Sequence, residues 1–139
     1  MIIKPFHMND LGFFDGNEFS EPHIVIDQLN DPAFEVQSLW DGGRVMAILC
    51  FRNYWGRNWM GFFLISKFFT PRHGYALKQH IKRVMEERDA LRLQTDSIAC
   101  KTLDRWHRWL GFKWEGCRKK MLFDRDYNAW AILRPNNGG

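Results

Sequence analysis

The sequence lacks paired cysteines and long uninterrupted apolar runs. Its three cysteines, Cys50, Cys100 and Cys117, are odd in number, widely spaced and form no C-x-x-C pair. This pattern favours reduced thiols over a disulfide scaffold and predicts that the chain holds no metal. No apolar run approaches the roughly 20 residues of a membrane span, and no charged start precedes an apolar run at the N-terminus. We therefore expect a soluble cytoplasmic protein with no membrane contact.

A strong charge of one sign is also missing. The formal net charge is +4 and the pI is near 9.1, which is compatible with an anionic ligand but too weak for a basic nucleic-acid-binding tail. Lys78, Lys82 and Arg83 could form a basic helix face for nucleic acid. Because Glu86 and Glu87 lie beside them, their field is weakened and nucleic acid is not an expected partner.

Aromatic residues, in contrast, are abundant. The 139 residues include 12 Phe and 7 Trp, and 45% of the chain is hydrophobic. This composition predicts one globular domain over residues 1–139 that ends in a polar tail at 135–139. The rings either fill the core or line a binding surface. Trp55, in a turn with a glycine, could pack on a sheet or line a substrate groove.

The first half of the chain reads mostly as strands. Asp41-Gly42-Gly43 is a turn signal between two runs rich in β-branched and aromatic residues, which predicts a hairpin. The segment 59–69 is so apolar that we expect a central strand covered on both faces. Segment 23–29 could be a helix or a strand. The expected elements are a strand at 1–6, a turn or weak helix at 8–14, and strands at 34–40, 44–52 and 59–69.

The second half alternates helices and strands. Leu77, Ile81, Val84 and Met85 recur at helical spacing and predict a helix from Tyr75 to about residue 88. A second, shorter helix should end at a glycine. The remaining expected elements are a strand at 90–99, that second helix at 101–112, and a closing hairpin of 113–123 and 129–135 around a turn at 124–128.

The stretch FFTPRHGYALKQH, residues 68–80, marks the point where a strand gives way to a helix. Pro71 ends the strand and suits a helix start. Gly74 and Ala76 are small, and Arg72 and His73 add basic side chains. Since the amides of a helix start attract anions, the stretch is consistent with a phosphate-binding turn. Gly74 could equally serve only to allow a tight turn.

The order of elements resembles that of the GNAT superfamily, the acetyl-CoA-dependent N-acetyltransferases. In that family a Gln/Arg-x-x-Gly-x-Gly/Ala turn follows the fourth strand, and PRHGYA at 71–76 occupies that place. LIS at 64–66 falls where the family's strand splays from its neighbour. DRWHRWLGFKWEG at 104–116 and IIKPFHMNDL at 2–11 are similar to the family's last helix and its first strand and turn.

The resemblance implies an α/β fold: one domain with a central, mixed, twisted sheet of about six or seven strands and helices on both faces. It also implies an acetyl-CoA-dependent N-acetyltransferase whose acceptor is an unidentified small-molecule or protein amine. The implied pantetheine contacts are Leu64, Ile65 and Ser66. The implied pyrophosphate contacts are Arg72, His73, Gly74, Tyr75 and Ala76.

The chain departs from the family pattern at residues that bear on catalysis. Pro71 stands where the family prefers Gln or Arg, so one backbone donor is missing, and no acid lies on 59–69 to act as a base. Cys100 stands where the family often has an Asn, and it could be a small buried hydrophobic residue or a nucleophile. His107 stands where many members carry the Tyr that protonates the leaving thiolate. It is the candidate catalytic acid, or else a packing residue beside Trp106.

These departures are similar to a narrower group, the short GNAT-like internal virion proteins of short-tailed phages. That resemblance implies an alternative function: a non-catalytic structural or assembly protein with virion components as partners. The protein would then be found in the host cytoplasm or the virion. Whether the chain is an enzyme depends on whether the departures have removed catalysis.

Overall fold

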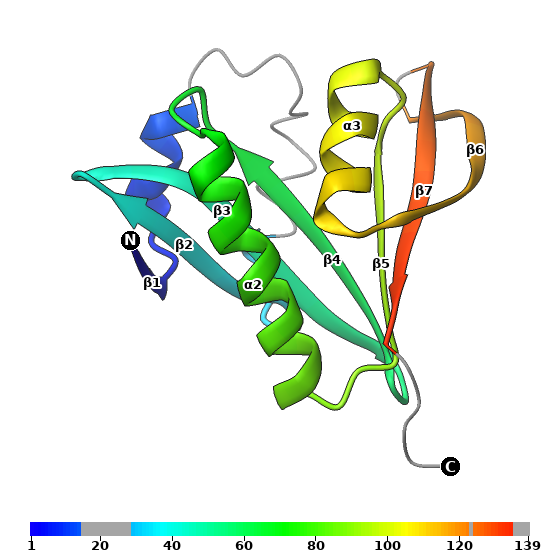
Figure 1. The fold of residues 1–139 in the computed structure, drawn as a ribbon, viewed down its shortest axis with the longest axis horizontal. Coiled ribbons are helices and arrows are strands. Elements are labelled where there is room, and N and C mark those ends of the chain that lie inside the picture. Colours follow the sequence, from blue (N-terminus) through cyan, green and yellow to red (C-terminus); the bar gives the residue numbers. More distant parts are fainter. Residues whose placement is uncertain (15–28, 123, 135–139) are drawn as a thin grey trace.

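A computed structural model describes residues 1–14, 29–122 and 124–134 (Figure 1). The predicted order of strands and helices is confirmed across these residues. The elements are β1 (Ile2–Pro5), the 3-10 helix η1 (Met8–Phe14), β2 (Glu35–Asp41), β3 (Arg44–Trp55), β4 (Asn58–Ile65), α2 (Pro71–Glu87), β5 (Arg92–Ile98), α3 (Lys101–Leu110), β6 (Lys113–Leu122) and β7 (Arg125–Leu133).

The strands form one seven-stranded sheet in the order β1-β2-β3-β4-β5-β7-β6. Every neighbouring pair is antiparallel except β4 and β5, which are parallel. The sheet is therefore mixed, as predicted, and β4 is its middle strand. The β2–β3 hairpin turns at Gly42 and Gly43, both with positive φ, because a tight turn between paired Asp41 and Arg44 requires left-handed backbone.

The two faces of the sheet carry separate hydrophobic clusters. Leu49 and Phe51 of β3 point to the face covered by α2 and α3, where the buried side chains of both helices and of β7 gather. Their neighbours Ile48 and Cys50 point to the opposite face, against apolar residues of η1. Side chains alternate across a strand, so β3 supplies both clusters. Helices on both faces of the sheet are thus confirmed, with α2 and α3 on the same side (Figure 1).

Two predicted boundaries between β4 and α2 were wrong. The strand expected at 59–69 ends at Ile65, and Phe69 N–H bonds the Ser66 carbonyl in a turn. The helix expected from Tyr75 begins at Pro71, with Thr70 as its N-cap. Proline lacks an N–H but suits the first helical position, where no intrahelical partner is needed. The residues expected in a turn before the helix therefore form its first turn.

Some predictions fall outside the part of the chain that the structure describes. The choice between helix and strand at 23–29 is one, since only Leu29 of that segment is described, and the polar tail at 135–139 is another. Among the described residues, no helix is long and apolar enough to cross a membrane.

Candidate functional site

The parallel strands β4 and β5 pair over only three residues each. Pairing runs from Asn58 with Arg92 to Met60 with Gln94. Beyond this point β4 continues to Ile65 and β5 to Ile98, and each keeps its antiparallel partner on the other side. The two strands therefore diverge toward their carboxyl ends, as Figure 1 shows. Within the part of the chain that the structure describes, β5 therefore pairs with β4 only up to Met60, and the later residues of β4 face the opening between the two strands.

The hydrogen bonds of β4 show which residues face that opening. Ser66 N–H donates to the Met46 carbonyl of β3, so its main chain is directed away from β5. Main-chain groups alternate direction along a strand. Of the three predicted pantetheine contacts, Ile65 therefore directs its N–H and C=O toward β5, whereas Leu64 and Ser66 direct theirs toward β3. The side chains of Leu64 and Ser66 are buried.

The start of α2 uses most of its own hydrogen-bond donors. Pro71 has no N–H, and Gly74 N–H already bonds the Thr70 carbonyl. Thr70 and His73 form a capping box, in which Thr70 N–H donates to His73 Nδ1 at 2.9 Å. The other half of the box directs the His73 N–H to the Thr70 side chain, so among the first four helical residues the amide of Arg72 is left available to an anion.

An acidic side chain already lies against the basic residues of this helix start. Asp41, at the end of β2, accepts hydrogen bonds from the Arg72 guanidinium and, at 2.8 Å, from His73 Nε2. His73 Nδ1 accepts from Thr70, so in the neutral ring the proton lies on Nε2 and points to Asp41. These bonds, from His73 first and then from Arg72, hold the pKa of Asp41 below its ordinary value. Arg72 and His73 would meet a phosphate only by sharing or releasing Asp41.

Gly74 is buried because α3 packs directly against it. A Cβ at this position would lie 2.6 Å from the ring of Trp106 and 3.0 Å from that of Trp109. Trp106 also contacts Phe69 edge-on, with ring centroids 5.1 Å apart. The missing side chain therefore makes room for two indoles. Tyr75, in contrast, projects outward and is 60% exposed.

His107 lies on the core side of α3. Its ring is buried and stacks on Trp130, with centroids 5.4 Å apart. Burial lowers its pKa, so the ring is neutral near pH 7. The Leu103 carbonyl lies 2.7 Å from Nδ1 and can only accept, so Nδ1 carries the proton and Nε2 has none to donate. Protonating a thiolate from Nε2 would require the imidazolium form, which this environment disfavours.

The remaining candidates, Trp55 and Cys100, lie at opposite ends of the diverging strands. Trp55 pairs with Asn58 at the other end of β4 and is 77% exposed. Cys100 is the half-buried N-cap of α3, while burial raises the pKa of Cys50. Over the described ranges, no group of three or more His, Cys, Asp or Glu residues could hold a metal ion.

The residues that close the helix start were not predicted from the sequence. Asp41 was interpreted only as the first residue of a turn, and no contact was predicted for Trp109. The contact of Trp106 with Gly74 was not predicted either. The spacing of Trp106 and Trp109, one turn apart, does indicate a ring-bearing helix face. Nothing in the sequence pairs that face with Gly74.

No family model matches the sequence, and no curated protein is significantly similar to it. Solved structures do match. Spermidine N-acetyltransferase from Vibrio cholerae aligns with a TM-score of 0.72 and 12% identity over 96% of this chain and 95% of its own. A GNAT-family acetyltransferase from Bacillus anthracis aligns with a TM-score of 0.68 and 16% identity, covering 94% and 93%.

An aminoglycoside 6'-N-acetyltransferase complexed with coenzyme A aligns over 98% of this chain and 100% of its own, with a TM-score of 0.67 and 15% identity. These matches span nearly the whole of both chains. The predicted fold class is therefore confirmed: the chain has the GNAT fold. Similarity at this level of identity establishes the fold and leaves function to be argued from the site.

Proposed function

We propose that the protein transfers an acetyl group from acetyl-CoA to an amine. The observation that carries the proposal is the divergence of β4 from β5 after Met60 in a sheet of the GNAT fold. A pantetheine arm contains two amide groups, which can pair with a strand edge as another strand would. Ile65, whose main chain faces the diverging strand, is the residue of the predicted trio with the right direction.

The two halves of the predicted cofactor site fit acetyl-CoA unequally. The strand edge suits the pantetheine arm. The helix start suits the pyrophosphate less well, because the Gly74 amide is engaged and Asp41 already bonds the side chains of Arg72 and His73. We infer that the pantetheine arm provides most of the binding free energy. Residues 72–76 contribute only when Asp41 releases its hydrogen bonds to Arg72 and His73.

The chemistry that a bound thioester would supply is an acyl group activated toward amines. The neutral amine nitrogen attacks the carbonyl carbon, and the C–N bond forms. The C–S bond then breaks, the thiolate leaves, and the nitrogen gives its proton to solvent water. The chain contributes position, since holding the two reactants together lowers the barrier. A main-chain N–H on the β4 edge can stabilise the carbonyl oxygen as it gains charge.

A second candidate is a GNAT-fold protein without catalysis, and specific observations favour it. Trp106 and Trp109 cover the Gly74 side of the helix start, and the ring of His107 is neutral with its proton already bonded. A scaffold that had lost turnover could tolerate both features. The assignment of such a scaffold to a phage virion rests on the sequence resemblance alone.

Calorimetric titration with acetyl-CoA and with S-acetylpantetheine tests how the binding free energy is divided between the pantetheine arm and the pyrophosphate. We expect the two ligands to bind with affinities within about tenfold of each other, because the pyrophosphate gains little. Asp41→Asn should then tighten acetyl-CoA about threefold or more and leave S-acetylpantetheine unchanged, since it removes a competing anion. Asp96→Asn is the matched control: it removes a carboxylate bonded to Arg118 on another strand.

Turnover is measured as thiol release with spermidine, an aminoglycoside and a peptide with an N-terminal alanine as acceptors. Similar structures include enzymes described as acting on spermidine, on a ribosomal-protein alanine and on aminoglycosides. Release that depends on an amine supports the transferase. Absence of acetyl-CoA binding at hundreds of micromolar would overturn it. Binding without release for any acceptor would favour the non-catalytic scaffold.

A further inference from the structure

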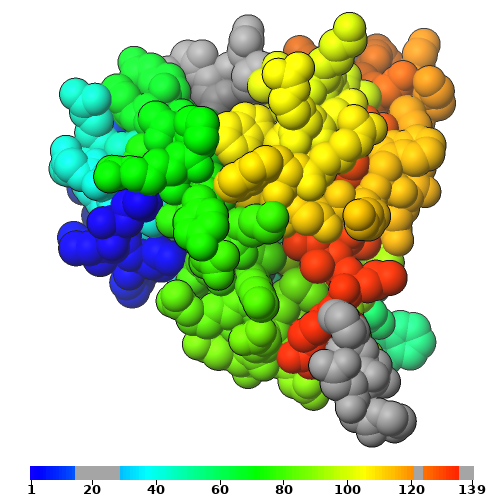
Figure 2. Space-filling view, viewed as in Figure 1, coloured from blue at the N-terminus to red at the C-terminus, as the bar shows by residue number. Residues whose placement is uncertain are grey.

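A second concave site lies at the other end of α2, beside the carboxyl end of α3. Both helices begin at the same end of the sheet, but α2 has 17 residues and α3 only 10. Gly111, in the left-handed conformation, ends α3 and turns the chain into β6. The later turns of α2 therefore face the end of β7 with no helix between them, as Figures 1 and 2 show. A hollow of about 800 Å³ remains there.

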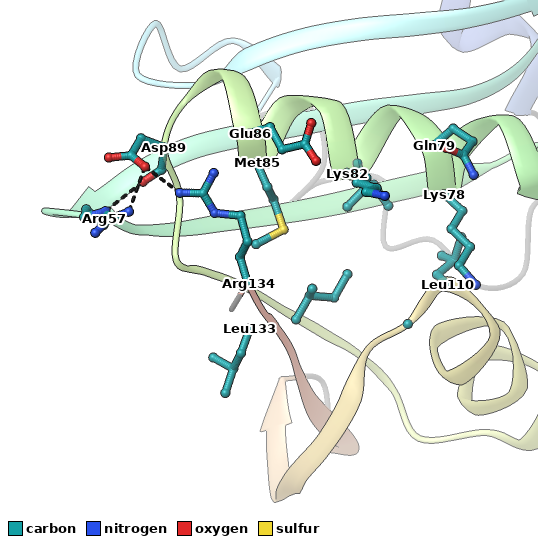
Figure 3. A pocket seen from close by; sticks show the side chains of 13 residues that line it. Arg57, Lys78, Gln79, Lys82, Met85, Glu86, Asp89, Leu110, Leu133 and Arg134 are labelled. Atoms are coloured by element: carbon teal, nitrogen blue, oxygen red, sulfur yellow. Dashed lines mark hydrogen bonds and ion pairs between the residues drawn. The ribbon is translucent and has the colours of Figure 1, made fainter. Parts of the chain in front are cut away.

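The floor of this hollow is apolar. Ile81 and Met85 contribute from α2, Leu110 from the last turn of α3, and Ile132 from β7. Figure 3 shows the Met85 side chain extending from the helix into the hollow. An apolar floor in a concavity of this size, within the roughly 300–1,000 Å³ of small-molecule sites, favours the non-polar part of a ligand.

One end of the hollow is closed by a cluster of one carboxylate and two guanidinium groups. Asp89 accepts from Arg57 at 2.7 Å and also from Arg134, which reaches it from the end of β7 (Figure 3). These bonds lower the pKa of Asp89. Its negative charge is therefore shared by two guanidinium groups and does not repel an anionic ligand strongly.

The wall along α2 carries two lysines one turn apart. Lys78 lies with its ammonium 5.4 Å from the ring centroid of Trp109, and Lys82 has no ion-pair partner among the described residues. The lining as a whole contains four cationic side chains against the two carboxylates of Glu86 and Asp89. Glu86 lies on the same wall as the two lysines, and Asp89 lies with the two arginines, so the positive surplus is divided between the α2 wall and the arginine end. A net positive lining above an apolar floor is complementary to an anion attached to a hydrocarbon body.

This hollow is separate from the proposed thioester site. Lys78 lies seven residues after Pro71, about 10 Å along the helix axis, and the rest of the hollow lies farther from the helix start. Arg57 and Arg134 lie near the paired ends of β4 and β5, whereas the proposed site uses their diverging ends. Occupation of one site does not require occupation of the other.

We propose that this hollow binds an amphiphilic carboxylate, a free molecule with a carboxylate head and an aliphatic body. The head pairs with Lys78 and Lys82, and the body lies on Ile81, Met85 and Ile132. Flexible ammonium groups on adjacent turns of a helix can both reach one carboxylate.

Calorimetry with decanoate and with decylammonium, which share a hydrocarbon chain and differ in charge, tests the proposal. Wild type should bind decanoate saturably and more tightly than decylammonium. The double variant Lys78→Met/Lys82→Met should bind decanoate about tenfold more weakly, because two charge-assisted contacts are lost and the apolar floor is kept. Lys78→Glu/Lys82→Glu should prefer decylammonium.

Arg83→Met is the matched control. It removes a charge from the same helix at an exposed position outside the hollow, and it should change decanoate affinity less than about twofold. Acetyl-CoA affinity should be equal in wild type and the lysine variants. Urea unfolding of each variant verifies that it folds.

Three results would overturn the proposal. One is the absence of saturable decanoate binding up to about 1 mM. Another is equal decanoate affinity in wild type and the Lys78→Met/Lys82→Met variant. The third is a combined result: wild type cosediments with phosphatidylglycerol vesicles, the double variant does not, and free decanoate does not bind. That result would assign the two lysines to binding a membrane surface.

Discussion

Replacing Gly74 with alanine should destabilise the protein, although alanine is the better helix former. In an open helical position the change would stabilise by about 1 kcal/mol. Here the added Cβ would lie 2.6 Å from Trp106 and 3.0 Å from Trp109, so one or both rings must move. Crowding of a packed site costs about 1–3 kcal/mol. We expect a net loss of about 1 kcal/mol, which is a fall in Tm of about 4 °C for a chain of this size.

A double-mutant cycle separates the two contributions. Trp106→Leu removes the ring that stands closest to the new methyl group. In that background Gly74→Ala should become neutral or stabilising by up to about 1 kcal/mol, because the helix-propensity gain remains and most of the crowding does not. Urea unfolding of the four proteins gives the coupling between residues 74 and 106.

The same variant distinguishes packing from ligand binding at Gly74. If Gly74→Ala stabilises the wild-type background, the packing argument is wrong. If it leaves stability unchanged and weakens acetyl-CoA binding more than S-acetylpantetheine binding, the glycine serves phosphate approach, as the sequence motif suggested. Loss of stability with unchanged ligand affinity supports the structural reason.

Three further predictions follow from pKa values and burial. The pKa of Asp41 is below its ordinary value in the folded protein, so its contribution to stability is present above about pH 4 and is lost as pH falls through its pKa in the folded state. Asp41→Asn should therefore weaken the decline in stability, measured by urea unfolding, between about pH 5 and pH 3. Because the pKa of His107 is lowered in the folded protein, stability should fall as pH drops below about 6.5. His107→Phe keeps a ring on Trp130, so it should flatten that decline and retain any turnover. His107→Ala should lower the free energy of unfolding by about 2–4 kcal/mol. A more than 100-fold fall in turnover for the Phe variant, on the order of 3 kcal/mol in barrier, would restore the general-acid role. Burial raises the pKa of the Cys50 thiol, so iodoacetamide should label Cys117 and Cys100 in the native protein and Cys50 only after unfolding, as mass spectrometry of the peptides will show.

Local patterns were enough to predict the order of elements. The two glycines after Asp41 predicted the first hairpin, since tight turns require left-handed backbone. The helical spacing of Leu77, Ile81, Val84 and Met85 predicted the buried face of α2, and all four are buried. These features depend on neighbours a few residues away, and the sequence therefore contains them. The fold class followed from their order.

Boundaries that depend on a single capping interaction were predicted less well. Pro71 was expected to end the strand, but β4 ends at Ile65, and the helix starts at the proline because Thr70 and His73 cap each other. A glycine at the fourth helical position was instead interpreted as a turn residue. Glycine has two common uses, conformational freedom and close packing, and the sequence does not distinguish them.

The sequence by itself determined that strands and helices alternate in the GNAT order, that the fourth strand is apolar enough to be central, and that basic residues stand at the start of the following helix. Only the tertiary structure decided what those basic residues contact. Asp41 lies 31 residues before Arg72, and Trp106 lies 32 residues after Gly74. Contacts at such separations depend on how the sheet brings distant segments together. That packing places the Asp41 carboxylate and the Trp106 ring against the start of α2. It also leaves the hollow beside Lys78 and Lys82 open.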